Sequence, residues 1–294
     1  MTRPLQSALA RAASFSSPER SLARAREALV ESQGQLATGY KIRRASDDPS
    51  GFAQAKFLGR REDTLARYDK VIGAAELWVN QTENELGAMS EIFATASELG
   101  IRAANGLFDA EDIAQQIDDL REEAIVRLRT QVQGEYLFAG NETQTAPLDE
   151  NGVPQASTFT GARRREISPG HSIQINVVGA LEVDGVSAVQ RLEDLATAVR
   201  SNDGGDVRTA LGAVQSGIDL YARLGGQTGN AARQLSGARD ALESESIAVG
   251  ERRAQIEEID LAEVFGDVQR RQVALEAALR ATASSAQQTL LDYL

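Results

Sequence analysis

Few side chains in this 294-residue sequence have the types and spacing that catalysis or metal binding requires. The one histidine, His171, stands in a Pro-Gly turn without a second histidine at ligand spacing, which argues against a histidine base or a zinc site. Acidic residues occur as adjacent pairs, such as Asp118 with Asp119, and adjacent residues on a helix point in different directions. We therefore interpret these pairs as solvated faces and caps, not as an acid with its base.

The spacing of the glycines argues against nucleotide binding, and the absence of cysteine excludes thiol chemistry. The glycine pairs at 204–205 and 225–226 fit neither the dinucleotide-binding nor the P-loop spacing. Without cysteine the chain has no thiolate nucleophile, disulfide or zinc-thiolate site. The sequence thus predicts no catalytic, cofactor-binding or metal-binding residue, and a protein that is not an enzyme.

The charge balance argues against nucleic acid and membrane partners. A formal net charge of -12 repels phosphates and anionic lipids, and the short basic run 163–165 is typical of a solvated loop. No apolar run approaches the roughly 18 residues that a membrane span needs. The first twenty residues lack the continuous apolar segment of a secretory signal, so any export is expected to need no cleaved signal peptide.

One stretch, ATGYKIRRASDDPSGFAQA over residues 37–55, interrupts an otherwise helix-prone chain. Gly39 is placed to end one helix, whereas Asp48 and Pro49 suit the N-cap and first turn of the next. Capping explains the acidic pair and the proline, but it does not require the basic pair before them. We therefore treat seven residues as a candidate assembly joint: Tyr40, Ile42, Arg43, Arg44, Asp47, Asp48 and Pro49.

Apolar residues at alternating spacings of three and four predict coiled-coil-like seams on the helices around this joint. The predicted helices cover residues 18–37, 50–105, 109–133, 186–201 and 206–242, followed by one unbroken helix from 243 to the C-terminus. The seam residues are Leu22, Leu29, Leu36, Ile72, Val79, Leu86, Met89, Phe93, Leu261, Val264, Val268 and Leu275. Because narrow seams on isolated helices are marginal in water, each helix needs a partner.

Between the helical halves, residues 134–185 are rich in glycine and turn residues, and HSIQINVVG alternates apolar and polar positions. The sequence therefore predicts a mainly α fold, an elongated antiparallel helical rod with a small β-rich insert. The predicted parts are a terminal helix and joint (1–45), rod helices (46–133), the insert (134–185), rod helices (186–246) and a C-terminal helix (247–294).

The joint and its surroundings resemble the flagellin family. The resemblance lies in QLATGYKIRRASDDPSG (35–51), residues 81–83 and ASELGIRAANG (96–106). GEYLFAGNETQTAP (134–147), IEEIDLAEV and the C-terminal QVALEAALRATASSAQQTLLDYL resemble more narrowly the hook–filament junction members of that family. The final residues Leu290, Leu291, Tyr293 and Leu294 favour a junction protein over a flagellin and are expected to act in assembly.

This resemblance implies an extracellular structural adaptor of the bacterial flagellum. It implies a self-associated ring that sits on the first hook-associated protein and carries flagellin, with an export chaperone that binds the C-terminal helix. The terminal helices would pair into an inner tube, and the joint charges would bind neighbouring subunits, although Arg43 and Arg44 also fit a plain exposed loop. Two alternatives stay open: a minor flagellin of the filament and, with less support, a non-flagellar coiled-coil scaffold.

Overall fold

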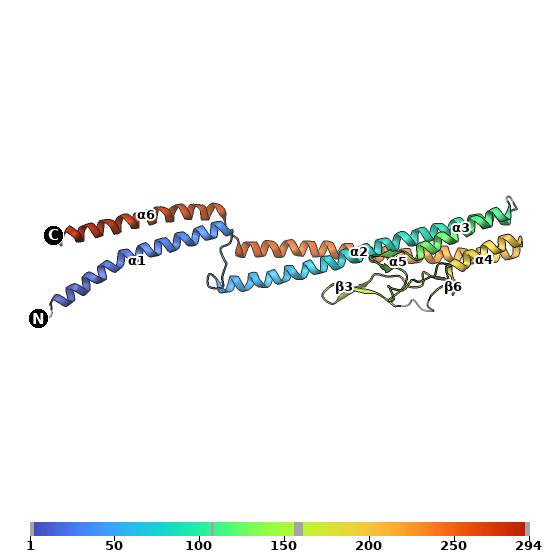
Figure 1. Cartoon of the computed structure of the whole chain (residues 1–294), viewed down its shortest axis with the longest axis horizontal. Coiled ribbons are helices and arrows are strands. Elements are labelled where there is room, and N and C mark those ends of the chain that lie inside the picture. The colour runs from blue at the N-terminus through green and yellow to red at the C-terminus, as the bar shows by residue number, and fades with distance from the viewer. Residues whose placement is uncertain (1–2, 107–108, 156–160, 292–294) are drawn as a thin grey trace. The chain divides into compact units, whose positions relative to one another are not determined.

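A computed structural model describes residues 3–106, 109–155 and 161–291, with side chains between residues 20 and 284 of those ranges. The chain is mainly α-helical, its long helices pack antiparallel, and its β structure consists of small two-stranded sheets, which confirms the predicted fold class (Figure 1). The chain forms two compact units, one of residues 1–63 with 246–294 and one of residues 64–245.

The first unit contains the two ends of the chain, in helices α1 (Arg3–Thr38) and α6 (Leu261–Leu291). They lie side by side and antiparallel (Figure 1). Arg271, which interrupts the predicted apolar seam of α6, donates to the carbonyl oxygen of Ala28 at 2.6 Å and lies 4.0 Å from the carboxylate of Glu31. A polar contact thus replaces an apolar one at this position of the pair.

Two further helices begin or end in this unit. Helix α2 (Pro49–Ala104) starts here, and helix α5 (Gly204–Glu257) ends here. The Arg253 guanidinium of α5 donates to the Glu62 carboxylate of α2 at 2.6 Å. This ion pair between Arg253 and Glu62 links the end of α5 to the beginning of α2.

Helix α1 begins earlier than the sequence prediction, which started it at Pro18. The segment LQSALARAA before the proline is rich in strong helix formers, and their propensity offsets the backbone donor that Pro18 lacks. Pro18 therefore lies inside the helix and not in its first turn.

The predicted unbroken helix from residue 243 to the C-terminus is wrong, because residues 258–260 separate α5 from α6. Asp260 caps the new helix: its carboxylate accepts the backbone N–H of Ala262 at 2.8 Å and of Glu263 at 3.2 Å. Asp followed three residues later by Glu is a capping signal that the seam periodicity concealed.

The second unit has an extended apolar core. Its helices are the remainder of α2 and α5, with α3 (Ala110–Leu128) and α4 (Ala188–Ser201). Phe93 of α2 meets Tyr221 of α5 with ring centroids 5.3 Å apart, and both side chains are fully buried. Burial raises the pKa of the Tyr221 hydroxyl, which stays neutral and donates to the Ala180 carbonyl at 2.8 Å. The aromatic pair thereby joins both long helices to the insert.

Three antiparallel hairpins form the insert and extend past its predicted bounds of 134–185, because helix α3 ends at Leu128 and not at residue 133 as predicted. These are β1 (Gln131–Val132) with β2 (Glu135–Tyr136), β3 (Arg164–Ser168) with β4 (His171–Gln174), and β5 (Glu182–Val183) with β6 (Val186–Ser187). Strand β4 is shorter than the predicted segment HSIQINVVG. The apolar positions Ile173, Ile175 and Val177 are all buried, but the alternation ends beyond β4, because Asn176 is buried as well.

Arg163 corrects the interpretation of residues 163–165 as a solvated loop. Its guanidinium lies over the Trp78 ring, 4.3 Å from the centroid, and pairs with the Glu135 carboxylate. The Glu135 pKa lies below its usual range because of the hydrogen bond from Arg163. The residue therefore anchors the insert to α2.

Helices α2 and α5 approach closely at Gly217. A Cβ atom there would lie 2.3 Å from the Phe93 ring, which is buried and has no room to move. We expect Gly217→Ala to destabilise the second unit by about 1–3 kcal/mol in urea unfolding. Gly212→Ala, at an exposed glycine of α5 with open space around its Cβ position, should instead stabilise by up to about 1 kcal/mol. Equal effects of the two substitutions would contradict this packing.

Candidate functional site

The candidate joint connects α1 to α2 within the first unit. Gly39 ends α1 with a positive φ of 77°, and its N–H donates to the Gln35 carbonyl at 2.8 Å. Helix α2 begins at Pro49, as the sequence predicts. The helix stop and the helix start expected from local chemistry are therefore both present.

The joint has a second half that sequence reasoning missed. Tyr40 forms an isolated antiparallel bridge with Glu258, in the break between α5 and α6. The Lys41 N–H donates to the Glu257 carbonyl at 2.7 Å, and the Ile259 N–H donates to the Gly39 carbonyl at 3.1 Å. The loop between α1 and α2 and the break between α5 and α6 are thus hydrogen-bonded to each other.

The side chain of Lys41 adds a further bond between the α1–α2 loop and the end of α5. The Lys41 ammonium donates to the Gln255 carbonyl in the last turn of α5 at 2.7 Å. The last carbonyl groups of a helix lack partners within that helix, and they attract cations. Lys41 was not among the predicted joint residues. The only signal for it in the sequence was its basic side chain next to Tyr40.

The acidic pair serves the joint itself. One carboxylate oxygen of Asp47 accepts the backbone N–H groups of Arg43 at 3.0 Å and Arg44 at 2.9 Å. These bonds hold the pKa of Asp47 below its usual value. Asp48 accepts the N–H of Ser50 at 3.0 Å, as a cap of α2. The two acidic side chains shape the loop and begin the next helix.

The basic pair has a different environment. The Arg43 guanidinium lies against Gly34 of α1, where a Cβ atom would come within 2.8 Å of Nη1. Both arginine side chains are exposed, and neither forms an ion pair with another described residue. Tyr40 is also exposed, whereas Ile42 is buried. Charged and aromatic groups of the joint thus remain available to other molecules.

The predicted seams differ between the two units. In the second unit Ile72, Val79, Leu86, Met89 and Phe93 of α2 are all buried. In the terminal pair most seam residues are only half-buried: Leu22, Leu29, Leu36, Val264 and Leu275. Val268 alone among them is buried, and Leu261 is 62% exposed because it stands at the first position of α6. The terminal pair therefore buries much less of its seam than α2 does.

Large apolar side chains lie exposed on the first unit. They include Val30, Phe57, Ile247, Leu261, Phe265, Val273 and Leu279. Leu261 and Phe265 lie on neighbouring turns of α6, and contiguous exposed apolar surface is typical of contacts with other proteins. The side chains of Leu290 and Leu291, and Tyr293 and Leu294 altogether, lie outside the described residues.

The described residues contain no group of three or more His, Cys, Asp and Glu side chains that could hold a metal ion. Among the helices that the structure describes, none is long and apolar enough to cross a membrane.

Gly51 in the first turn of α2 is tightly enclosed by the joint. A Cβ atom would lie 2.3 Å from the Asp48 carboxylate and 2.6 Å from Cδ1 of Ile42, so Gly51→Ala should displace the cap. Gly59→Ala on the same helix meets only Arg253, at 3.8 Å. We expect Gly51→Ala to be less stable than Gly59→Ala by about 1–2 kcal/mol in urea unfolding, because cap loss offsets the gain in helix propensity. Indistinguishable stabilities would argue against an ordered joint in the free chain.

Comparison with known proteins places these features in a family context. Residues 12–143 match the family described as "Bacterial flagellin N-terminal helical region". The flagellar hook-associated protein 3 of Salmonella typhimurium is 30% identical over 120 residues, which cover 40% of this chain and 38% of that protein. Flagellin FlaB1 of Treponema pallidum is 33% identical over 81 residues, 28% of each chain.

The fold is shared with solved structures. The crystal structure of Bacillus cereus FlgL is similar with a TM-score of 0.60 at 18% sequence identity, over 67% of this chain and 98% of that one. The match to the Salmonella relative spans less than two thirds of that relative's length. Residues 12–143 therefore resemble the bacterial flagellin N-terminal helical region, and part of the chain is similar to proteins named flagellar hook-associated protein 3.

Proposed function

We propose that this protein is a structural adaptor subunit at the junction between the hook and the filament of the bacterial flagellum. The observation that carries the proposal is the incomplete burial of the terminal pair: α1 and α6 pack against each other but leave large apolar side chains exposed. Neighbouring copies in a ring would cover that surface. The similarity to hook-associated proteins 3 supports the same role.

The proposed partners follow from this position. The ring sits on the first hook-associated protein and carries flagellin, so that the subunit bridges a flexible hook and a stiffer filament. Segments 1–45 and 247–294 form the inner tube, 46–133 and 186–246 the rod, and 134–185 the insert. Arg43 and Arg44, whose guanidinium groups form no ion pair with the described residues, bind acidic groups of neighbouring subunits.

Export is proposed to precede folding. A chain without cysteine passes through a narrow export channel without disulfides to constrain it. A cytoplasmic chaperone covers the exposed apolar residues of α6 until export. The subunit then folds and acts outside the cell, as an adaptor and not as an enzyme.

A minor flagellin of the filament is the second candidate. The match to flagellin FlaB1 of Treponema pallidum favours it, because the matched region alone does not separate the two classes. A non-flagellar coiled-coil scaffold is less well supported, since it gives no reason for a joint of this sequence.

Localisation on intact flagella separates these candidates. Immunogold labelling with an antibody against residues 148–185 should give a single band where the hook meets the filament. Label along the whole filament would identify a minor flagellin. No label on any flagellum would support the scaffold. A strain that lacks the gene provides the control for antibody specificity.

Removal of α6 tests the role of the terminal pair. Deletion of residues 261–294 takes away the surface on which α1 packs, including the Arg271 contact with Ala28. We expect the truncated chain to lose both chaperone capture in a pull-down and incorporation into flagella. Export and junction assembly at the level of the full-length chain would contradict the proposal.

A further inference from the structure

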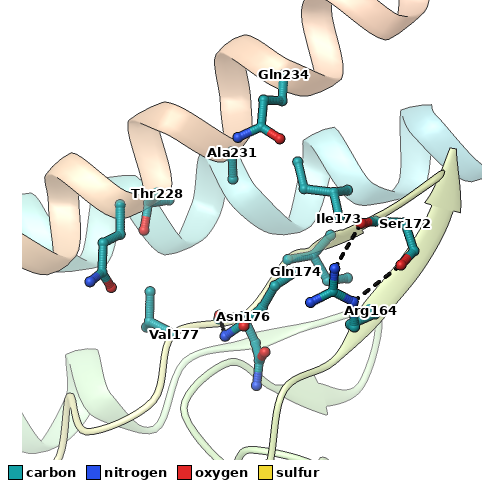
Figure 2. A pocket seen from close by; sticks show the side chains of 11 residues that line it. Arg164, Ser172, Ile173, Gln174, Asn176, Val177, Thr228, Ala231 and Gln234 are labelled. Carbon is teal, nitrogen blue, oxygen red and sulfur yellow. Dashed lines mark hydrogen bonds between the residues drawn. The ribbon is translucent and has the colours of Figure 1, made fainter.

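A polar slot of about 380 Å³ lies in the second unit between strand β4 and helix α5 (Figure 2). One wall is the run of consecutive residues 172–177, and the other is formed by Gln227, Thr228, Ala231 and Gln234. Successive residues of a strand point to opposite faces of a sheet. Ser172, Ile173 and Gln174 of β4 all line the slot, so the wall follows the edge of the strand there and continues over residues 175–177 beyond it. The slot therefore opens on the free edge of the β3–β4 hairpin.

The backbone of Gln174 is unpaired at this edge. The Ile175 N–H donates to the Arg163 carbonyl at 2.9 Å, and Ile173 stands opposite Arg165. Hydrogen-bonded and non-hydrogen-bonded pairs alternate along an antiparallel ladder. Gln174 therefore turns its N–H and C=O away from β3, and neither group has a hydrogen-bond partner among the described residues. A residue on an added strand could exchange two hydrogen bonds with these two groups.

The α5 wall leaves room for an added backbone. The Thr228 hydroxyl donates to the Leu224 carbonyl within its own helix at 3.0 Å, and Ala231 is small. Gln227 and Gln234 flank them, and their amides have no partner among the described residues. Figure 2 shows Gln234 on the side of the helix that faces the hairpin. Each amide offers both a donor and an acceptor for the outer edge of an added strand.

The slot selects against basic ligands. Its only charged lining residue among those described, Arg164, already donates from Nε to the Ser172 hydroxyl at 3.1 Å and from Nη2 to the Ser172 carbonyl at 2.9 Å (Figure 2). The remaining lining groups are amides, hydroxyls and apolar carbons. A basic ligand group would gain no counter-charge from these residues and would lose hydration.

We propose that the slot binds an extended peptide segment of a partner protein without basic side chains, which adds as a third strand beside β4. Main-chain hydrogen bonds supply the affinity in this mode of recognition, and Gln174 exchanges two of them with the peptide. Among the described residues no third strand pairs with the β3–β4 hairpin, so the edge of β4 is open to a segment of another protein. The proposal concerns the insert and does not depend on the junction role.

The probe is the peptide acetyl-Thr-Ser-Thr-Val-Thr-Ser-amide, which is uncharged and favours an extended backbone. We expect its saturating addition to the full-length protein to slow hydrogen exchange of the Gln174 amide at least tenfold. The same peptide with alternate backbone nitrogens methylated should give no slowing. No slowing with the unmodified peptide would overturn the proposal, because recognition of the main chain tolerates changes in side-chain sequence.

Two variants at one position test the main-chain contact. Gln174→Pro removes the outward N–H but no ladder donor, because proline is tolerated where an edge N–H faces away from the sheet. It should weaken peptide binding at least tenfold, with the Ile173 and Ile175 amides still protected. Gln174→Ala keeps the N–H and should bind within about twofold of the original chain. Equal binding by both variants would contradict the proposal.

Other occupants give different results. An N-acetylglucosamine oligomer that protects Gln174 where the peptide does not would make the slot a glycan site. Self-association of the free chain that Gln174→Pro abolishes would assign the slot to a second copy. Either result would overturn the proposal.

Ala231→Gln fills the slot from α5. This variant should abolish peptide binding without a change in the unfolding midpoint, so that loss of binding can be told apart from loss of folding.

Discussion

The pairing of the two chain ends is the constraint on which the first unit depends. α1 and α6 each present a narrow seam, and isolated helices of this kind are marginal in water. Backbone bonds between Lys41 and Glu257 and between Ile259 and Gly39 set the register of the ends where both helices meet the joint. Pairing still leaves Val30, Phe265 and Val273 exposed, and under the proposed function other chains cover them.

The second unit also exposes large apolar side chains, such as Val126, but it has an extended core of its own. Its core joins α2, α3, α4 and α5 with the insert, and residues such as Phe93, Tyr221 and Leu148 are fully buried. Burial of each large apolar side chain contributes about 1.5–3 kcal/mol. One chain thus combines a unit with its own core and a unit whose apolar surface exceeds what it can bury alone. This combination suits a subunit that folds in part before assembly and in part during it.

Sequence reasoning predicted the features that depend on local chemistry. The seam of α2, the glycine stop at Gly39 and the start at Pro49 follow from periodicity and capping, which act over a few residues. The break at residues 258–260 was missed because a continuous apolar pattern concealed it and because it depends on backbone bonds to a distant segment. Arg163 was misjudged for a similar reason: Trp78 and Glu135, which bury it, lie far from it in sequence.

Cysteine labelling measures most directly whether neighbouring chains cover the terminal pair, since the sequence contains no cysteine of its own. Val273 is 67% exposed in the free chain, and Val153 in the insert is 56% exposed. Maleimide should modify Val273→Cys and Val153→Cys at similar rates in the free protein. In intact flagella we expect Val273→Cys to be protected while Val153→Cys stays reactive. Equal reactivity of Val273→Cys in both states would contradict the claim that assembly completes the first unit.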